Sequence, residues 1–161
     1  MQQKKRILLL ATGGTIASRK SDNGLKPQIT PEELIEYIPQ VKEICDVEAV
    51  QLLNLDSTNM EPSHWKLMVH AIWEHYDDFD GFVIAHGTDT LAYTASLLAL
   101  ALSKVEIPVF LVSSQLPLNQ EGANGNENFR RSVELICAGI HSGVYVVYRN
   151  EDGRCFLHHG G

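Results

Sequence analysis

Short apolar runs alternate along this chain with longer stretches in which apolar residues recur every three or four positions. Runs rich in Ile, Val, Leu and Phe, bounded by polar turns, predict buried strands, whereas the three-to-four spacing predicts helices. The pattern predicts strands at 6–10, 43–53, 82–85, 107–112, 144–148 and 154–157. It predicts helices from Pro31, with Thr30 as N-cap, and at 61–76, 91–102 and 127–141.

Strand and helix follow each other in regular alternation, which indicates a parallel sheet with right-handed crossovers. We therefore predict an α/β fold: a doubly wound, mostly parallel sheet with helices on both faces, in a flavodoxin-like or Rossmann-like three-layer arrangement. Residues 150–153, Asn-Glu-Asp-Gly, predict a turn that closes a terminal β-hairpin. Residues 22–24, Asp-Asn-Gly, predict the tip of a mobile loop or hairpin, a candidate lid.

Two of the predicted helices differ in their apolar pattern. In the helix at 61–76 the apolar side chains form a stripe that includes Trp65, Met68 and Ile72, which indicates core packing and not a cofactor site. The helix at 91–102 is apolar nearly all round, so we expect it to be covered on both sides.

Polar turns follow three of the predicted strands, at the ends where ligands bind in parallel α/β sheets. The strand at 82–85 ends in His-Gly-Thr-Asp-Thr (86–90), the first strand in Ala-Thr-Gly-Gly-Thr (11–15), and the strand at 43–53 is followed by Asp-Ser-Thr-Asn (56–59). Helix capping alone explains a Thr or Asp before an apolar helix. The repetition of hydroxyl-rich turns favours a site.

Nucleotide binding is not indicated. The paired glycines Gly13 and Gly14 expose backbone N–H groups and allow a close approach. However, the chain contains neither G-x-G-x-x-G nor G-K-[ST], the two phosphate-binding patterns.

Composition and charge narrow the classes of protein to which the chain could belong. The 161 residues suit one domain, and 44% hydrophobic with 20% charged residues is typical of globular proteins. A net charge of −7, with no basic cluster beyond residues 4–6, argues against nucleic acid. The apolar run after residue 6 is too short for a signal peptide, so we predict a cytoplasmic protein with no membrane partner.

The cysteines and histidines lack the spacing of a metal site. Cys45, Cys137 and Cys155 are far apart in the sequence and contain no C-x-x-C, which predicts buried thiols and no disulfide framework. His70 and His75 are five apart, so they do not share a helical face. We predict no metal and no cofactor.

Two long stretches, A-T-G-G-T-I-A-S at 11–18 and H-G-T-D-T-L-A-Y-T-A at 86–95, occur in this order in the chain. They resemble the two signature stretches of the bacterial-type L-asparaginase/glutaminase family, and the resemblance extends to 53–60, 109–115 and 124–125. It covers nearly the whole chain and implies the family's amino-terminal α/β domain over 1–161, without the smaller carboxy-terminal domain that follows in the longer family members.

The resemblance also implies the site. Thr15 would be the nucleophile, and Thr88 would help to activate it or a water while its backbone N–H binds the oxyanion. Asp89 would hold the substrate ammonium group and Ser57 its α-carboxylate, while Thr58 stands where the family often has a pocket-lining Gln.

Two family residues are replaced. The family commonly has a Tyr in the lid, where this chain has Leu25. It also has a Lys near the last strands, where His158 stands in this chain as a candidate base, since a histidine titrates near neutrality.

The function implied is hydrolysis of L-asparagine to L-aspartate and ammonia, in a homodimer or homotetramer whose neighbouring protomer contributes an acidic residue from its second domain. The alternatives are a glutaminase, the ammonia-releasing subunit of a tRNA-dependent amidotransferase, and a non-catalytic amino-acid-binding module. The 161-residue domain alone is expected to have little or no activity.

Overall fold

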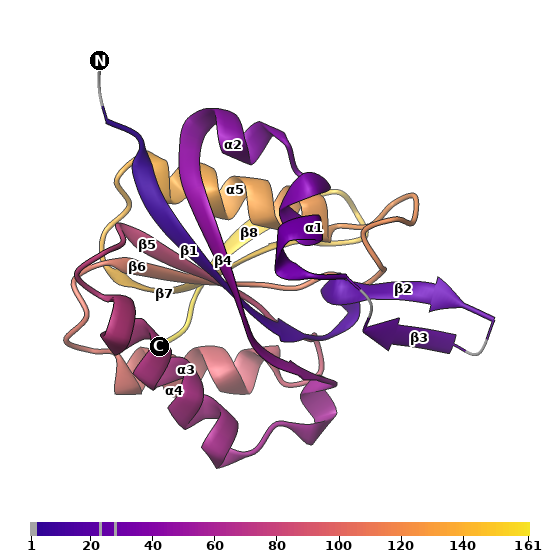
Figure 1. Cartoon of the computed structure of the whole chain (residues 1–161), viewed down its shortest axis with the longest axis horizontal. Helices are drawn as coiled ribbons and strands as arrows, with labels where there is room; N and C mark the ends of the chain where they lie inside the picture. The colour runs from indigo at the N-terminus through magenta and orange to yellow at the C-terminus, as the bar shows by residue number, and fades with distance from the viewer. Residues whose placement is uncertain (1–2, 23, 28) are drawn as a thin grey trace.

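A six-stranded sheet with the strand order β4-β1-β5-β6-β7-β8 forms the middle layer of the chain (Figure 1). The computed structural model describes residues 3–22, 24–27 and 29–161. The strands of this sheet are β1 (Lys5–Gly13), β4 (Cys45–Leu55), β5 (Gly81–Ala85), β6 (Pro108–Val112), β7 (Gly143–Arg149) and β8 (Cys155–His159). All neighbouring strands are parallel except β7 and β8, which are antiparallel.

The strand order reverses direction at β1, as in flavodoxin-like sheets, where a ligand site lies at the carboxyl ends of the strands beside the reversal. β4 and β5 are the two neighbours of β1, and the chain leaves all three strands at the same edge of the sheet. The predicted doubly wound, mostly parallel fold is confirmed.

Helices cover both faces of the sheet (Figure 1). On one face α1 (Pro31–Glu36), α2 (Gln40–Ile44) and α5 (Gly125–Cys137) contribute Leu34, Val41 and Phe129 to one apolar core that also contains Ile7 and Leu9 of β1. On the other face α3 (Pro62–His75) and α4 (Leu91–Ala101) pack against the alternate side chains of β1. The central strands β5 and β6 are buried along their whole length, as their unbroken apolar runs predict.

Several element boundaries differ from those predicted. A short helix, α2, occupies residues 40–44, so β4 begins at Cys45 and not at residue 43. α5 begins at Gly125 and ends at Cys137, four residues before the predicted end. α1 begins as predicted: Thr30 accepts a bond from the Glu33 N–H, and the Glu33 side chain accepts one from the Thr30 N–H.

The outer face of α4 is open. Tyr93 and Leu100 are 71% and 79% exposed, whereas Thr94, Ala95 and Leu98 on the inner face are buried. Within this single chain the sheet covers only the inner face of α4. The expectation that something else covers its outer face stays a prediction. Trp73 on α3 is likewise 44% exposed, although Met68 and Ile72 of the predicted stripe are fully buried.

Two hairpins extend the fold. β2 (Ser18–Ser21) and β3 (Gly24–Pro27) form a separate antiparallel ribbon that projects from the carboxyl edge of the sheet (Figure 1). Asn23 and the Leu25 side chain lie outside the described part of the structure, and the role of this ribbon as a lid stays a prediction. The predicted terminal hairpin is confirmed: the Asn150 N–H donates to the Arg154 carbonyl at 2.8 Å, and Gly153 takes a φ of +81°.

Candidate active site

Three polar turns touch one another at the carboxyl edge of the sheet. Gly14, which follows β1, has φ +82° and ψ −178°, and a Cβ atom there would lie 2.5 Å from the backbone N and Cα of Gly87. A Cβ atom on Gly87, which follows β5, would lie 2.6 Å from Oγ of Ser57. Only glycine at positions 14 and 87 lets the three backbones approach so closely.

Hydrogen bonds also join these turns. The Thr12 hydroxyl donates to the Ala85 carbonyl at 2.7 Å, which connects the ends of β1 and β5. The Thr90 hydroxyl donates to the Ser57 carbonyl at 2.9 Å, which connects the β5 turn to the short 3-10 helix Ser57–Asn59 after β4. The turns predicted from the sequence are thus brought together as one rigid group.

The candidate residues differ in their exposure. Thr15, the first residue of the short 3-10 helix Thr15–Ala17, is half-buried, and Thr88 and Asp89 are exposed. Ser57 is only 2% exposed. Thr58 is exposed and its hydroxyl donates to Oδ1 of Asp56 at 2.9 Å. A ligand can therefore reach Thr88 and Asp89 directly.

Thr88 and His158 line one cleft between α4 and the β7–β8 hairpin, with a volume of about 410 Å³. Ala95 and Ser96 of α4 and Tyr148 of β7 contribute to the same walls. His158 is exposed in β8, where it pairs with Val146. Thr15, Ser57 and Asp89 are not among the residues that line this cleft. The structure thus brings His158 into the same cleft as Thr88, and its role as a base stays a prediction.

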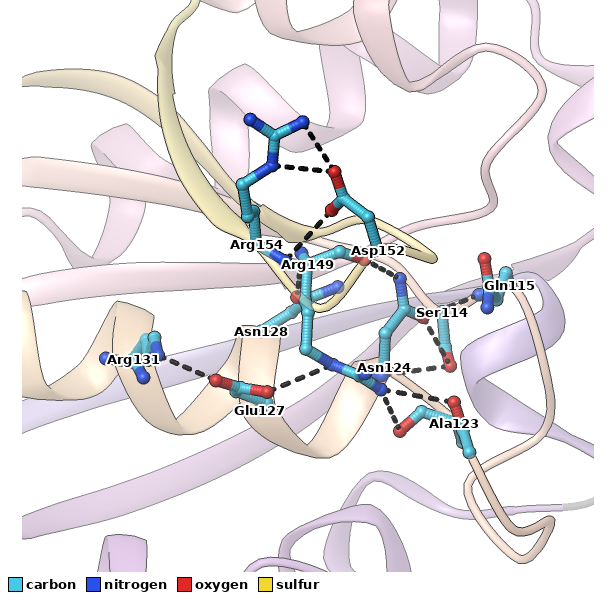
Figure 2. A network of polar contacts seen from close by, with 12 residues as sticks. Ser114, Gln115, Ala123, Asn124, Glu127, Asn128, Arg131, Arg149, Asp152 and Arg154 are labelled. Atoms are coloured by element: carbon cyan, nitrogen blue, oxygen red, sulfur yellow. Dashed lines mark hydrogen bonds and ion pairs between the residues drawn. The ribbon is translucent and has the colours of Figure 1, made fainter.

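Buried asparagines brace the neighbouring strand ends (Figure 2). The Asn128 side chain on α5 donates to the Ser113 carbonyl at 3.0 Å and accepts from the Arg149 N–H at 2.8 Å. Asn124 accepts from the Gln115 N–H and donates to the Arg149 carbonyl, both at 2.9 Å. The ends of β6 and β7 are therefore fixed to each other, and Glu127 pairs with the Arg149 guanidinium at 3.0 Å beside them.

His86 carries no role predicted from the sequence, although it opens the β5 turn. It is fully buried, its Nδ1 lies 2.7 Å from the Gly87 carbonyl oxygen, and its Nε2 lies 2.9 Å from the Thr94 hydroxyl. The only sequence signal for it is a histidine placed at the junction between an apolar strand and a polar turn.

Burial lowers the pKa of His86 below its ordinary value of 6.5, while its bond to the Gly87 carbonyl acts weakly in the opposite direction. In the unfolded chain this imidazole takes up a proton near pH 6.5, whereas the folded chain does so only at lower pH. The free energy of unfolding is therefore expected to fall as the pH drops below 6.5, by up to about 1.4 kcal/mol per pH unit from this group. Thermal melts between pH 7.5 and 5 should show a smaller acid loss in His86→Asn, and parallel curves for variant and wild type would contradict this prediction.

Other chemistries find little support among the described residues. No three His, Cys, Asp or Glu side chains in that part of the chain are grouped so as to hold a metal ion. Burial raises the pKa of Cys45 to about 12, which leaves its thiol protonated at neutral pH. Within residues 3–22, 24–27 and 29–161, no helix has the length and apolar character needed to cross a bilayer.

The arrangement defines a class of site: hydroxyl groups on strand-end turns, two of them glycine-containing, with the exposed carboxylates of Asp56 and Asp89, at the carboxyl edge of a flavodoxin-like sheet. Residues 6–160 match the family model described as "Asparaginase, N-terminal". The chain belongs to this family, and its named relatives include an L-asparaginase and subunits of a tRNA-dependent amidotransferase.

Two kinds of curated relative resemble the chain to a similar degree. It is 36% identical over 147 residues to an L-asparaginase of Thermococcus kodakarensis, covering 91% of this chain and 44% of that protein. It is 37% identical over 161 residues to one of the subunits of the glutamyl-tRNA(Gln) amidotransferase of Methanococcus maripaludis strain C5, covering 97% of this chain and 38% of that protein. The chain therefore spans less than half the length of these relatives.

Solved structures agree with the family assignment. The thermostable L-asparaginase from Thermococcus kodakarensis superposes with a TM-score of 0.77 at 35% identity, covering 88% of this chain and 43% of that one. A probable cytoplasmic L-asparaginase from Campylobacter jejuni gives the same TM-score at 28% identity, covering 98% of this chain and 58% of that one.

Proposed function

We propose that this chain is the amino-terminal catalytic domain of an amide hydrolase that converts L-asparagine to L-aspartate and ammonia, in the cytoplasm. The observation that supports this most is the contact of the three turns that carry Thr15, Ser57 and Thr88-Asp89, through the glycines at 14 and 87. The family relationship supplies the reaction class.

The proposed reaction proceeds through an acyl-enzyme. Oγ of Thr15 attacks the carboxamide carbon and loses its proton to a base, and the C–N bond breaks as the leaving nitrogen takes up a proton and departs as ammonia. Water then cleaves the ester to release aspartate. The Thr88 N–H donates a hydrogen bond to the oxyanion. His158, in the same cleft as Thr88, is the candidate base.

Asp89 is proposed to bind the substrate ammonium group. It is exposed beside the start of α4, and none of the ion pairs in the described part of the chain includes it. Ser57 would then bind the substrate α-carboxylate, and Thr58 would line the pocket wall. Because Ser57 is buried, the carboxylate would contact it through its backbone or after a small local opening of the turn.

Asp89→Asn is expected to weaken binding of aspartate by about 10- to 100-fold, because a charge-assisted hydrogen bond is lost. Calorimetry with aspartate and with succinate, which lacks the ammonium group, measures this directly. Wild type should prefer aspartate, and the variant should bind both equally. Succinate binding to wild type as tightly as aspartate does would contradict the role of Asp89.

The similar identity to an amidotransferase component favours a second candidate function, release of ammonia from an amide for a tRNA-dependent amidation. A glutaminase is the related possibility. Both differ from the first proposal in substrate: they require glutamine, or an amide substrate presented with a partner protein. A non-catalytic module would bind aspartate without releasing ammonia from any amide.

Ammonia release from asparagine and from glutamine distinguishes these functions. We expect the full-length protein, a homodimer or homotetramer with a carboxy-terminal domain, to turn over asparagine faster than glutamine. The 161-residue chain should melt cooperatively but have little activity, because the second domain of a neighbouring protomer would no longer exclude water from the site. Equal turnover by the short chain would show that no further domain is needed.

A further inference from the structure

Every polar atom of His86 has a partner. Its N–H donates to the Val112 carbonyl at 2.9 Å, and its carbonyl accepts from the Ser113 hydroxyl at 2.6 Å. In the side chain, Nδ1 meets the Gly87 carbonyl oxygen at 2.7 Å and Nε2 meets the Thr94 hydroxyl at 2.9 Å. The ring thus stands in a fixed orientation between β6, α4 and the β5 turn.

The partners determine which ring nitrogen carries the proton. A carbonyl oxygen only accepts, so Nδ1 must donate to Gly87, and in a neutral imidazole Nε2 is then the acceptor. The Thr94 hydroxyl donates to Nε2 and itself accepts from Nε1–H of Trp65 at 2.8 Å. Trp65, Thr94, His86 and the Gly87 carbonyl thus form a hydrogen-bond relay in which every donor meets an acceptor. Thr94 and His86 are both fully buried.

This relay ends on the peptide group between Gly87 and Thr88. No peptide bond in the described chain is cis, so the C=O of Gly87 and the N–H of Thr88 point in opposite directions. Because the carbonyl faces the buried imidazole, the Thr88 N–H faces away from it. Within the described residues, no hydrogen bond uses this N–H as its donor.

We propose that His86 is a positioning residue for the oxyanion: its Nδ1–H holds the Gly87 carbonyl and so fixes the direction of the Thr88 N–H. The assignment rests on the proposed function, since it requires an amide substrate whose carbonyl oxygen becomes negatively charged. Position 87 must be glycine because a Cβ atom there would meet the Ser57 side chain, and glycine leaves the backbone free to rotate. The bond from His86 removes that freedom at the one peptide where direction determines catalysis.

The hydrogen-bond assignment is tested first, on the 161-residue chain and without substrate. Long-range ¹H–¹⁵N NMR correlations of the imidazole at pH 7 distinguish the two neutral tautomers and the charged ring. We expect His86 as the neutral Nδ1–H tautomer. An Nε2–H tautomer or a charged ring would overturn the proposal, because neither leaves the relay as described.

The kinetic test compares two substitutions of His86 in the full-length protein, by amide side chains of different length. In His86→Asn the side-chain NH₂ takes the place of Nδ1 and can still donate to Gly87, whereas in His86→Gln it reaches the place of Nε2 and cannot. We expect kcat for asparagine to fall about 10- to 100-fold in His86→Gln and to stay within about fivefold in His86→Asn, with KM changed less than about threefold in both.

If His86 had only a structural role, kcat should fall more in His86→Asn than in His86→Gln, because Gln fills more of the space of the imidazole and still contacts Thr94. Equal kcat in the two variants, or a loss confined to KM, would overturn the proposal.

Ser132→Ala is the stability control. It removes a buried hydroxyl that donates to the Asn128 carbonyl on α5 at 2.7 Å, so it should lower the melting temperature without changing kcat. A wild-type protein that releases no ammonia would instead overturn the proposed function, and this assignment with it.

Discussion

Thr15→Val is expected to abolish amide hydrolysis in the full-length protein, because valine has the shape of threonine without the attacking oxygen. Loss of a nucleophile leaves only the contribution of binding and oxyanion stabilisation, so kcat should fall by at least about 10⁴-fold. A burst assay at high enzyme concentration should detect no acyl-enzyme. Thr15→Ser, which keeps the hydroxyl, should retain measurable turnover.

Thr88→Val distinguishes the two proposed threonine roles. If Thr88 activates the nucleophile or the water, kcat should fall about 10²-fold or more while aspartate affinity stays nearly unchanged. Its backbone N–H is retained, so the oxyanion contact survives this substitution. Equal and mild losses in Thr15→Val and Thr88→Val would contradict a mechanism that uses two threonines.

Thr12→Val is the matched control for both variants. Thr12 lies at the end of β1, three residues before Thr15, and its buried hydroxyl donates to the Ala85 carbonyl. Removal of this bond should cost about 1 kcal/mol of stability, with kcat affected only slightly. A loss of turnover in Thr12→Val as large as in Thr15→Val would mean that the integrity of the turn, and not the Thr15 oxygen, limits the reaction.

The sequence predicts most of this fold because its local signals agree with one another. The apolar runs of β5 and β6 could only be buried strands between polar turns, and Thr30 with Glu33 forms the capping box that begins α1. It does not predict α2, because five residues before an edge strand give too short a pattern. It also does not say what covers the outer face of α4, because apolar composition alone does not identify the element that packs there.

The sequence also predicts part of the candidate site. Strand-end turns carrying Thr15, Ser57 and Thr88 follow from the sheet's topology, since parallel strands bring their carboxyl ends to one edge. The relay from Trp65 through Thr94 to His86 does not follow, because it joins two helices to a turn through side-chain directions that only packing determines. The residues proposed to carry the chemistry stand out in the sequence, whereas the contact of His86 with the Gly87 carbonyl does not.

Gly14→Ala is expected to be among the most destabilising single substitutions in this chain. Gly14 combines φ +82° with ψ −178°, a region essentially restricted to glycine, and holding an alanine there costs about 1–3 kcal/mol. The added Cβ would also lie 2.5 Å from the backbone N and Cα of Gly87. A backbone contact cannot be relieved by turning a side chain, so the two turns must separate.

Gly122→Ala supplies the control for backbone strain alone, since Gly122 has φ +83° and no atom within 4 Å of its added Cβ. Urea unfolding should therefore show a loss of about 1 kcal/mol for Gly122→Ala and of at least about 3 kcal/mol for Gly14→Ala. The difference between the two contains the contact between the β1 and β5 turns, together with any difference in backbone strain between the two positions. If the two losses are equal, the turns tolerate separation. In that case the close approach of Gly14 to Gly87 would not be what holds the turn that carries Thr15 against the turn that carries Thr88.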